Sequence, residues 1–216
     1  MPAKHTYREF IENHPQHIFN RGVEKRVIFT NQQDYRTFLY YLTIYLAKPK
    51  TLETRFPTLP GNLKINNVSE QIKLLTYCFM PNHFHLHLAP TNIETSQEII
   101  PKFMRQLSNA YTGYFNKKYD RVGPLFQGRY KSVLVSSDEQ NVHLHRYIQT
   151  NPLTAKLVKN LQDWPWSSYH EYVGGQKLDD ICQIEDIFSR FKNLDSYKNF
   201  LLEQVDTESI ESILLD

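Results

Sequence analysis

The chain has 216 residues, of which 40% are hydrophobic, 22% charged and 13% aromatic. This length predicts one domain, or one domain with an appendage, and the 13 Phe, 14 Tyr and 2 Trp residues exclude a disordered chain. No apolar run approaches the roughly 18 residues of a membrane span, and the first residues lack the apolar core of a signal peptide. We therefore expect a cytoplasmic protein that does not contact a membrane.

The formal net charge of +2 conceals an uneven distribution along the chain. Residues 101–131 contain seven cationic residues and one acid, whereas residues 179–216 contain ten acids and three cationic residues. The basic stretch indicates either a surface that binds the phosphates of a nucleic acid or a solvated helix face. Its cationic residues are Lys102, Arg105, Lys117, Lys118, Arg121, Arg129 and Lys131.

The first half of the chain predicts a strand, a helix and a β-rich region. Residues 16–23 alternate in hydrophobicity and predict a strand that ends at a glycine turn. Asn31 is typical of a helix N-cap, and an apolar stripe continues from it to about Ala47. Three prolines make residues 48–68 a predicted loop or extension. Residues 72–88 are rich in β-forming side chains but contain a proline, which leaves open two strands or one bent strand.

The second half predicts a helix, a strand and a further helix. A helix is expected from Thr95, with an apolar stripe on one face and basic residues on the other. Residues 130–135 predict a strand that follows glycine turns. Ser137 is a second expected N-cap, for a helix that ends near Thr150 because Pro152 disfavours the helical conformation of the residue before it. This order of elements predicts an α+β fold with one mostly antiparallel sheet and helices packed on it.

The stretch 80–88 contains the most informative residues of the sequence. Because side chains alternate along a strand, His83 and His85 share one face and lie about 7 Å apart. Two such imidazoles can converge on one cation, and the alternative is that they are structural. His87 extends the same face, either as a further ligand or as a polar residue at the strand end. His17, on the expected first strand, is another candidate to line the site.

Tyr147 and Asn151 form a second pair of candidates. They lie four residues apart and so share a helix face. An amide oxygen is a hard, neutral metal ligand, and a tyrosine beside a metal-bound phosphate is a plausible nucleophile. From spacing alone, the alternatives are a core tyrosine and an asparagine that ends a helix before a proline.

Residues 77–85, Tyr-Cys-Phe-Met-Pro-Asn-His-Phe-His, resemble the Y-x-h-M-P-N-H-h-H signature of the HUH single-tyrosine transposases, also called IS200-like. Within that family they are most similar to the REP-associated tyrosine transposases. Further motifs occur in the family order, and the resemblance covers roughly residues 16–202. These motifs are Asn-Arg-Gly at 20–22, Gly-Pro-Leu-Phe-Gln-Gly-Arg-Tyr-Lys-Ser at 123–132, Tyr-Ile-Gln-Thr-Asn-Pro at 147–152 and Trp-Ser-Ser-Tyr at 166–169.

The resemblance implies a fold and a set of metal ligands. The fold would be a ferredoxin-like antiparallel sheet of the HUH endonuclease type, in a domain of residues 1–175 followed by an acidic helical extension, residues 176–216. His83 and His85 would hold one divalent cation, with Asn151 as the third ligand. Mg²⁺ normally prefers oxygen ligands, so the two histidines also leave Mn²⁺ open.

The resemblance also implies the reaction and the partner. Tyr147 would attack single-stranded DNA, form a 5′-phosphotyrosine link and free a 3′ hydroxyl. The DNA would lie next to a hairpin from a repetitive extragenic palindrome (REP). Later attack of a 3′ hydroxyl on the phosphotyrosine would rejoin the strand without an external energy source. The expected oligomeric state is a monomer or a homodimer.

Five basic residues are expected to bind this DNA. Arg129 and Lys131 lie two apart on an expected strand, so both should point to one face, where they would contact phosphate or the hairpin. Arg105, Lys117 and Lys118, on the preceding helix, would contact the DNA backbone. The alternative for all five is ordinary surface solubility.

Two other functions compete with DNA cleavage. The first is a catalytically silent protein that binds hairpin DNA, although a pure binder has no need of Tyr147 one turn before Asn151. The second is a zinc hydrolase built on His83 and His85. Such a site needs an acidic base nearby, and no acid lies within eight residues on either side of His85.

Overall fold

The computed structural model describes residues 14–59, 61, 66–91, 93–174, 181–203 and 211. The strands are β1 (Gln16–Arg21), β2 (Ile72–Met80), β3 (His83–Pro90) and β4 (Lys131–Leu134). The helices are α1 (Gln32–Leu46), α2 (Pro49–Arg55), α4 (Ile93–Lys118), α5 (Asp138–Thr154), α6 (Tyr169–Val173), α7 (Glu185–Phe188) and α8 (Leu194–Leu202). None of the described helices is long and apolar enough to cross a membrane.

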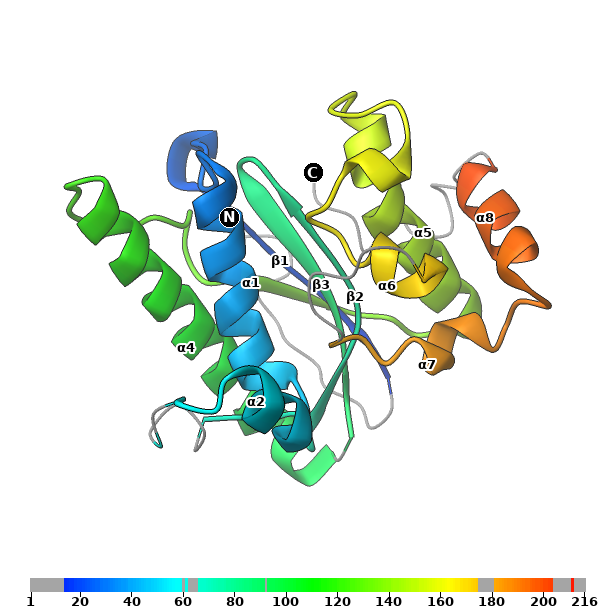
Figure 1. Ribbon diagram of the computed structural model, residues 1–216, viewed down its shortest axis with the longest axis horizontal. Helices are drawn as coiled ribbons and strands as arrows, with labels where there is room; N and C mark the ends of the chain where they lie inside the picture. Colours follow the sequence, from blue (N-terminus) through cyan, green and yellow to red (C-terminus); the bar gives the residue numbers. More distant parts are fainter. Residues whose placement is uncertain are drawn as a thin grey trace.

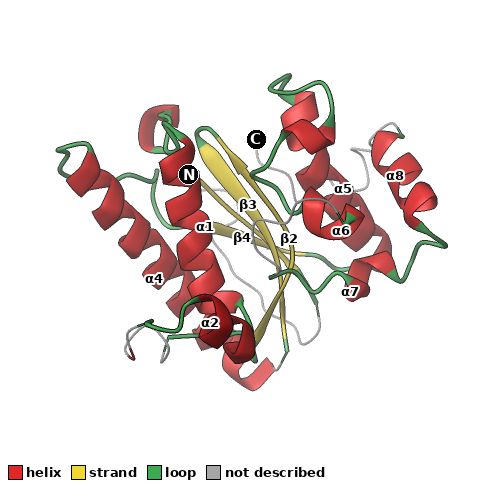
Figure 2. Ribbon diagram, viewed as in Figure 1, coloured by secondary structure: helices red, strands yellow, loops and turns green. Residues whose placement is uncertain are grey.

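The four strands form one antiparallel sheet in the order β2-β3-β1-β4. With α1 between β1 and β2, and α4 between β3 and β4, the chain follows the βαββαβ path of a ferredoxin-like fold. The predicted fold class is therefore confirmed. Helices α1, α2 and α4 cover one face of the sheet, and α5 to α8 cover the other (Figure 1). Figure 2 shows the strands between these two groups of helices.

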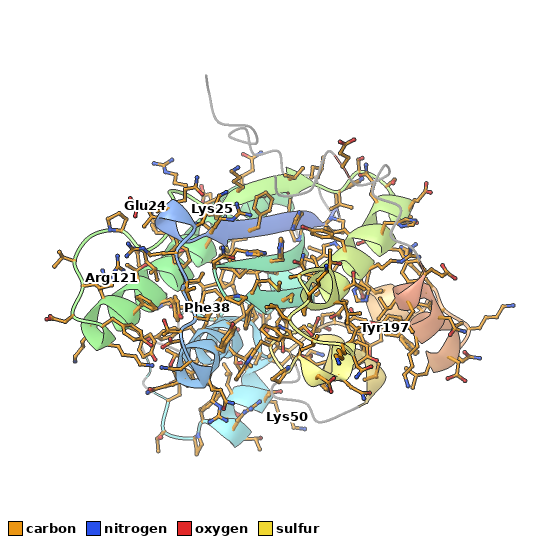
Figure 3. All side chains as sticks on the ribbon, turned by 90° about the horizontal axis from the view of Figure 1, so that it is seen from above. Glu24, Lys25, Phe38, Lys50, Arg121 and Tyr197 are labelled. Carbon is orange, nitrogen blue, oxygen red and sulfur yellow. The ribbon has the colours of Figure 1, made fainter. Side chains whose placement is uncertain are left out.

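The face beneath α1 and α4 is the hydrophobic core. Ile18 of β1 and Phe84 of β3 are fully buried there together with Phe38 of α1 and Phe103 of α4. Phe38 lies on this side of the sheet, whereas Tyr197 of α8 lies on the other (Figure 3). The capping box that starts α1 was predicted in part, because the Asn31 side chain accepts hydrogen bonds from the first turn.

The face beneath α5 is unusually polar. His17, His85 and His87 are fully buried on it, because β1 and β3 place their alternate residues on this side. A small apolar cluster accompanies them, made of Cys78, Met80, Val135, Leu144 and Ile148. The helix therefore covers a layer of imidazoles rather than a purely hydrophobic surface.

The Trp-Ser-Ser-Tyr motif lies along the free edge of β2. The Phe79 N–H donates to the Trp166 carbonyl at 2.9 Å, and the Ser168 N–H donates to the Tyr77 carbonyl at 3.0 Å. This extended segment satisfies backbone groups that an exposed edge strand would leave unpaired.

Two predicted boundaries are wrong. The expected loop after α1 contains helix α2, which begins at Pro49, a residue whose fixed φ suits the first helical position. Helix α5 does not end before Pro152 but continues to Thr154. Pro152 removes one donor only, and the Ala155 N–H still donates to the Asn151 carbonyl at 2.9 Å. Asn151 therefore lies inside a helical turn.

Candidate active site

The pairing of β1 with β3 arranges the histidines on the α5 face. In this register Arg21 lies opposite His83, Phe19 opposite His85, and His17 opposite His87. The rings of His83 and His85 have centroids 4.9 Å apart and stand nearly perpendicular. His83 and His85 therefore lie on one face of β3, as strand alternation predicts.

The Nδ1 atoms of His83 and His85 each lie within hydrogen-bond distance of a neighbouring side chain. His83 Nδ1 lies 2.6 Å from Asn82 Oδ1, and because this amide oxygen can only accept, Nδ1 carries the proton. In the neutral ring Nε2 of His83 then has a free electron pair. His85 Nδ1 lies 2.9 Å from His17 Nε2, so His17 fixes the orientation of the His85 ring from the neighbouring strand.

His87 lies inside β3 rather than at a strand end. It is fully buried, and neither ring nitrogen has a hydrogen-bond partner in the described part of the structure. Burial lowers the pKa of His87 well below its usual value, and the nearby His145 and His17 lower it further. His87 is therefore a neutral ring in the polar layer and not the expected polar residue at a strand end.

Helix α5 brings Tyr147 and Asn151 over these histidines. Its start is fixed by Ser137, whose hydroxyl accepts from the Gln140 N–H at 3.1 Å, as predicted. The Tyr147 and His85 rings have centroids 5.6 Å apart in an edge-to-face arrangement. The Asn151 amide nitrogen lies 3.5 Å from His85 Nε2. Two residues of β3 and two of α5, about 65 positions apart in sequence, thus meet at one place.

The site is buried at one end and accessible at the other. His85 is fully buried, whereas His83, Tyr147 and Asn151 are only half-buried. Among the described residues, no group of three or more His, Cys, Asp or Glu side chains could hold a metal ion. The candidate donors that the described residues bring together here are two imidazoles and an amide, without the acidic ligand or base of a zinc hydrolase.

The environment keeps both histidines neutral. Burial, together with the charge of Arg21, lowers the pKa of His83 to about 4. Burial also lowers the pKa of His85 well below its usual value, and His83, His17 and Arg21 act in the same direction. Neutral imidazoles are the form that binds a metal.

The environment of Tyr147 acts in two directions. Burial raises its pKa above 10, while a hydrogen bond with Asn151 and the positive charge of Arg21 lower it in part. Burial alone would make the phenol a poorer nucleophile, so the neighbouring charge matters for any reaction at its oxygen.

The basic residues predicted to bind DNA lie in different parts of the structure. Lys131 lies over the Phe19 ring, with its Nζ 5.9 Å from the ring centroid, on the α5 face. Arg129 precedes β4 and lines a cavity of about 390 Å³ together with Arg105 of α4. The prediction that Arg129 and Lys131 point to one face is therefore wrong, because the strand begins only at Lys131.

The two lysines at the end of α4 also differ. Lys117 is exposed to solvent. Lys118 donates to the buried carboxylate of Asp34 at 2.6 Å and to Asn31 Oδ1 at 3.1 Å. Lys118 thus joins the last turn of α4 to the first turn of α1.

Arg21 is the site residue that the sequence reasoning did not identify. It belongs to the Asn-Arg-Gly motif, and its even spacing from His17 along β1 was a usable signal. That signal depends on which strand neighbours β3, and the pairing of β1 with β3 becomes clear only in the structure.

Parts of the chain are similar to known proteins. Residues 63–151 match the family model described as Transposase IS200 like. A protein of Haemophilus influenzae described as a REP-associated tyrosine transposase is 33% identical, over 44% of this chain and 58% of the relative. The chain thus spans little more than half of that relative. A solved REP-associated tyrosine transposase bound to a REP hairpin has a TM-score of 0.50 and 15% identity, over 81% of this chain and 88% of that one, which shows a shared fold.

Proposed function

Residues 63–151 match the family model of the IS200-like transposases, and from this similarity we propose that the chain cleaves and rejoins single-stranded DNA. Tyr147 is the proposed nucleophile, and the DNA lies next to a hairpin of a repetitive extragenic palindrome. The observation that carries the proposal is the edge-to-face contact of Tyr147 with His85, one helical turn before Asn151.

The donor atoms suit one divalent cation. His83 can offer Nε2, because its Nδ1 donates to Asn82. His85 can offer Nε2 if its Nδ1 donates to His17. A half-turn of the Asn151 amide presents its oxygen toward the same place, and the two orientations of an amide are assigned from hydrogen bonds. Two nitrogen ligands and one oxygen ligand are compatible with Mg²⁺ and favour Mn²⁺ more.

The bound cation would neutralise charge on the scissile phosphate and withdraw electrons from phosphorus. The phenol oxygen of Tyr147 forms a bond to phosphorus while the bond from phosphorus to the 3′ oxygen breaks. The phenol proton passes to solvent, and the leaving 3′ oxygen takes up a proton from solvent. The reverse reaction uses a 3′ hydroxyl as the nucleophile and the Tyr147 phenolate as the leaving group, so no other energy source is needed.

Hairpin DNA is the proposed partner for three reasons. Residues 63–151 match a transposase family model, a solved structure with a shared fold is bound to a REP hairpin, and residues 101–131 are strongly basic. Lys131 is the proposed phosphate contact on the α5 face. Arg105 and Arg129 would bind a different part of the DNA, because their cavity lies beside α4.

The test is a covalent adduct between the protein and DNA. Labelled single-stranded hairpin DNA from beside the gene is incubated with the protein and Mg²⁺ or Mn²⁺, and adducts that resist denaturation are counted. We expect an adduct that is lost with a chelator and in Tyr147→Phe. Tyr40→Phe, at a tyrosine on α1 in the other helix layer, should keep it. An adduct that persists in Tyr147→Phe, or hairpin binding without any adduct, would refute the proposed reaction, and the second result would leave a hairpin-binding protein.

A further inference from the structure

Arg21 is the last residue of β1 and lies directly opposite His83. Directly opposed residues of an antiparallel pair project to the same face, with their Cβ atoms about 5 Å apart. Arg21 therefore faces the side of the sheet that carries His83, His85 and Tyr147. Its charge acts on all three groups, because it lowers the pKa of each.

The backbone of Arg21 is held on both sides. Its N–H donates to the Asn20 side chain at 2.9 Å, and its carbonyl accepts from the Gln127 N–H at 2.8 Å. The Asn20 amide also donates to the Gly128 carbonyl at 3.1 Å. A Cβ on Gly22 would lie only 2.3 Å from the Arg26 carbonyl oxygen. Asn20 and Gly22 thus have structural roles in the Asn-Arg-Gly motif. They hold the backbone from which the Arg21 side chain projects.

The guanidinium of Arg21 has no comparable structural role. Its Nε is buried without a hydrogen-bond partner, and no acid of the described residues forms an ion pair with it. A buried donor with a positive charge and no acceptor is unfavourable on its own. An anion that enters from the accessible side of the site would supply the missing acceptor.

A phosphodiester fits this requirement. It has one negative charge shared by two non-bridging oxygens, and the planar guanidinium can donate to both at once. We propose that Arg21 is a catalytic residue that binds the non-bridging oxygens of the scissile phosphate while the Tyr147 oxygen attacks phosphorus. The inference rests on the proposed function and adds a phosphate-binding group to it.

In this step the bond from Tyr147 to phosphorus forms as the bond to the 3′ oxygen breaks, with the protons exchanged through solvent. Negative charge grows on the oxygens around phosphorus as the two bonds change. A fixed cation at those oxygens stabilises the transition state more than the bound substrate, which is the condition for a faster reaction. Arg21 therefore affects the rate of cleavage more than the affinity for DNA.

The test compares Arg21→Ala and Arg21→Lys with Arg36→Ala, which removes the same charge from an exposed position on α1. The measurements are the single-turnover rate of adduct formation, hairpin affinity by fluorescence anisotropy, and Mn²⁺ affinity by electron paramagnetic resonance. We expect Arg21→Ala to slow the adduct by about 10² to 10³-fold. Arg21→Lys should slow adduct formation about tenfold, because lysine keeps the positive charge but cannot donate to both phosphate oxygens at once as the planar guanidinium does. Arg36→Ala should leave the rate unchanged, and Mn²⁺ affinity should stay within about threefold in all three variants.

Chemical rescue separates a phosphate contact from a structural role. Guanidinium added at millimolar concentration should restore part of the Arg21→Ala rate but none of the His83→Ala rate. If Arg21→Ala is not folded by thermal melting, Arg21→Lys provides the test. An adduct rate for the Arg21 variants equal to wild type would overturn the inference alone. A loss matched by an equal loss of Mn²⁺ affinity would also overturn it, since Arg21 would then act through the histidines. No adduct in the wild type would overturn the proposed function and this inference with it.

Discussion

Lys118 joins the last turn of α4 to the first turn of α1 through a buried carboxylate. Its Nζ lies 2.6 Å from Asp34 Oδ1, 3.1 Å from Asn31 Oδ1 and 3.0 Å from the Tyr114 hydroxyl. The Asp34 carboxylate is fully buried, and only 21% of the Lys118 side chain is exposed. Replacing Lys118 by Ala should therefore reduce the stability of the α1–α4 layer.

The size of the effect follows from the contacts that remain. After the replacement, Asp34 still accepts from the hydroxyls of Tyr114 and Tyr119 and from the Thr30 N–H. The hydrogen bonds from Lys118 to Asp34, Asn31 and Tyr114 are lost. The bond to the buried carboxylate dominates and costs about 1.5 to 3 kcal/mol, and the partial exposure of Lys118 makes about 2 kcal/mol the better value. For a chain of this length, that corresponds to a fall in melting temperature of about 4 to 8 °C.

The assay is thermal and urea unfolding followed by circular dichroism, with Lys117→Ala as the control. Lys117 is exposed, so its replacement should change stability by less than about 0.5 kcal/mol. Its effect should instead be seen in hairpin binding. Loss of one phosphate contact should reduce the slope of log affinity against log salt concentration by about one. A melting temperature of Lys118→Ala within 1 °C of wild type, or about equal effects of the two variants on stability, would refute this reasoning.

Three further predictions follow from other contacts. His17→Leu should lower Mn²⁺ affinity about tenfold, because it removes the hydrogen bond that orients His85, and unchanged affinity in titrations would contradict this role. Burial lowers the pKa of His145 from 6.5 to about 3. Between these two pH values only the unfolded chain protonates this histidine, so the free energy of unfolding decreases as the pH is lowered below 6.5. In His145→Gln, the loss of unfolding free energy from pH 7.5 to 5.5 should be about 1 kcal/mol smaller. Gly22→Ala should destabilise by about 1 to 3 kcal/mol on melting because its Cβ meets the Arg26 carbonyl, whereas Gly113→Ala, with open space around it, should not.

The features that the sequence predicts well depend on local patterns. Strand alternation places His83 and His85 on one face, and helix periodicity does the same for Tyr147 and Asn151. The Asn31 and Ser137 caps are local signals too, and both are present. The family motifs add the fold, because they identify which strands and helices to expect and in which order.

The features that it misses depend on contacts between distant residues. The contact of Lys118 with Asp34, 84 positions away, becomes visible only in the structure. The Arg129 side chain does not share a sheet face with Lys131, because β4 starts two residues after Arg129. Pro152 is a strong local stop signal, yet the surrounding packing continues α5 through it. Propensities and charge patterns do not contain this tertiary information.

The topology of the sheet has a consequence for the order of folding. Hairpin β2–β3 closes over the two-residue turn of Pro81 and Asn82 and carries both histidines of the proposed cation site. Strand β1, by contrast, pairs with β3 and β4 through contacts such as His17 to His87 and His17 to Val133. Because closing long loops costs more entropy than closing short ones, we expect the hairpin to form early and β1 to enter between β3 and β4 late. Two of the three proposed cation ligands would then lie close together in a partly folded chain, without the proposed nucleophile on α5.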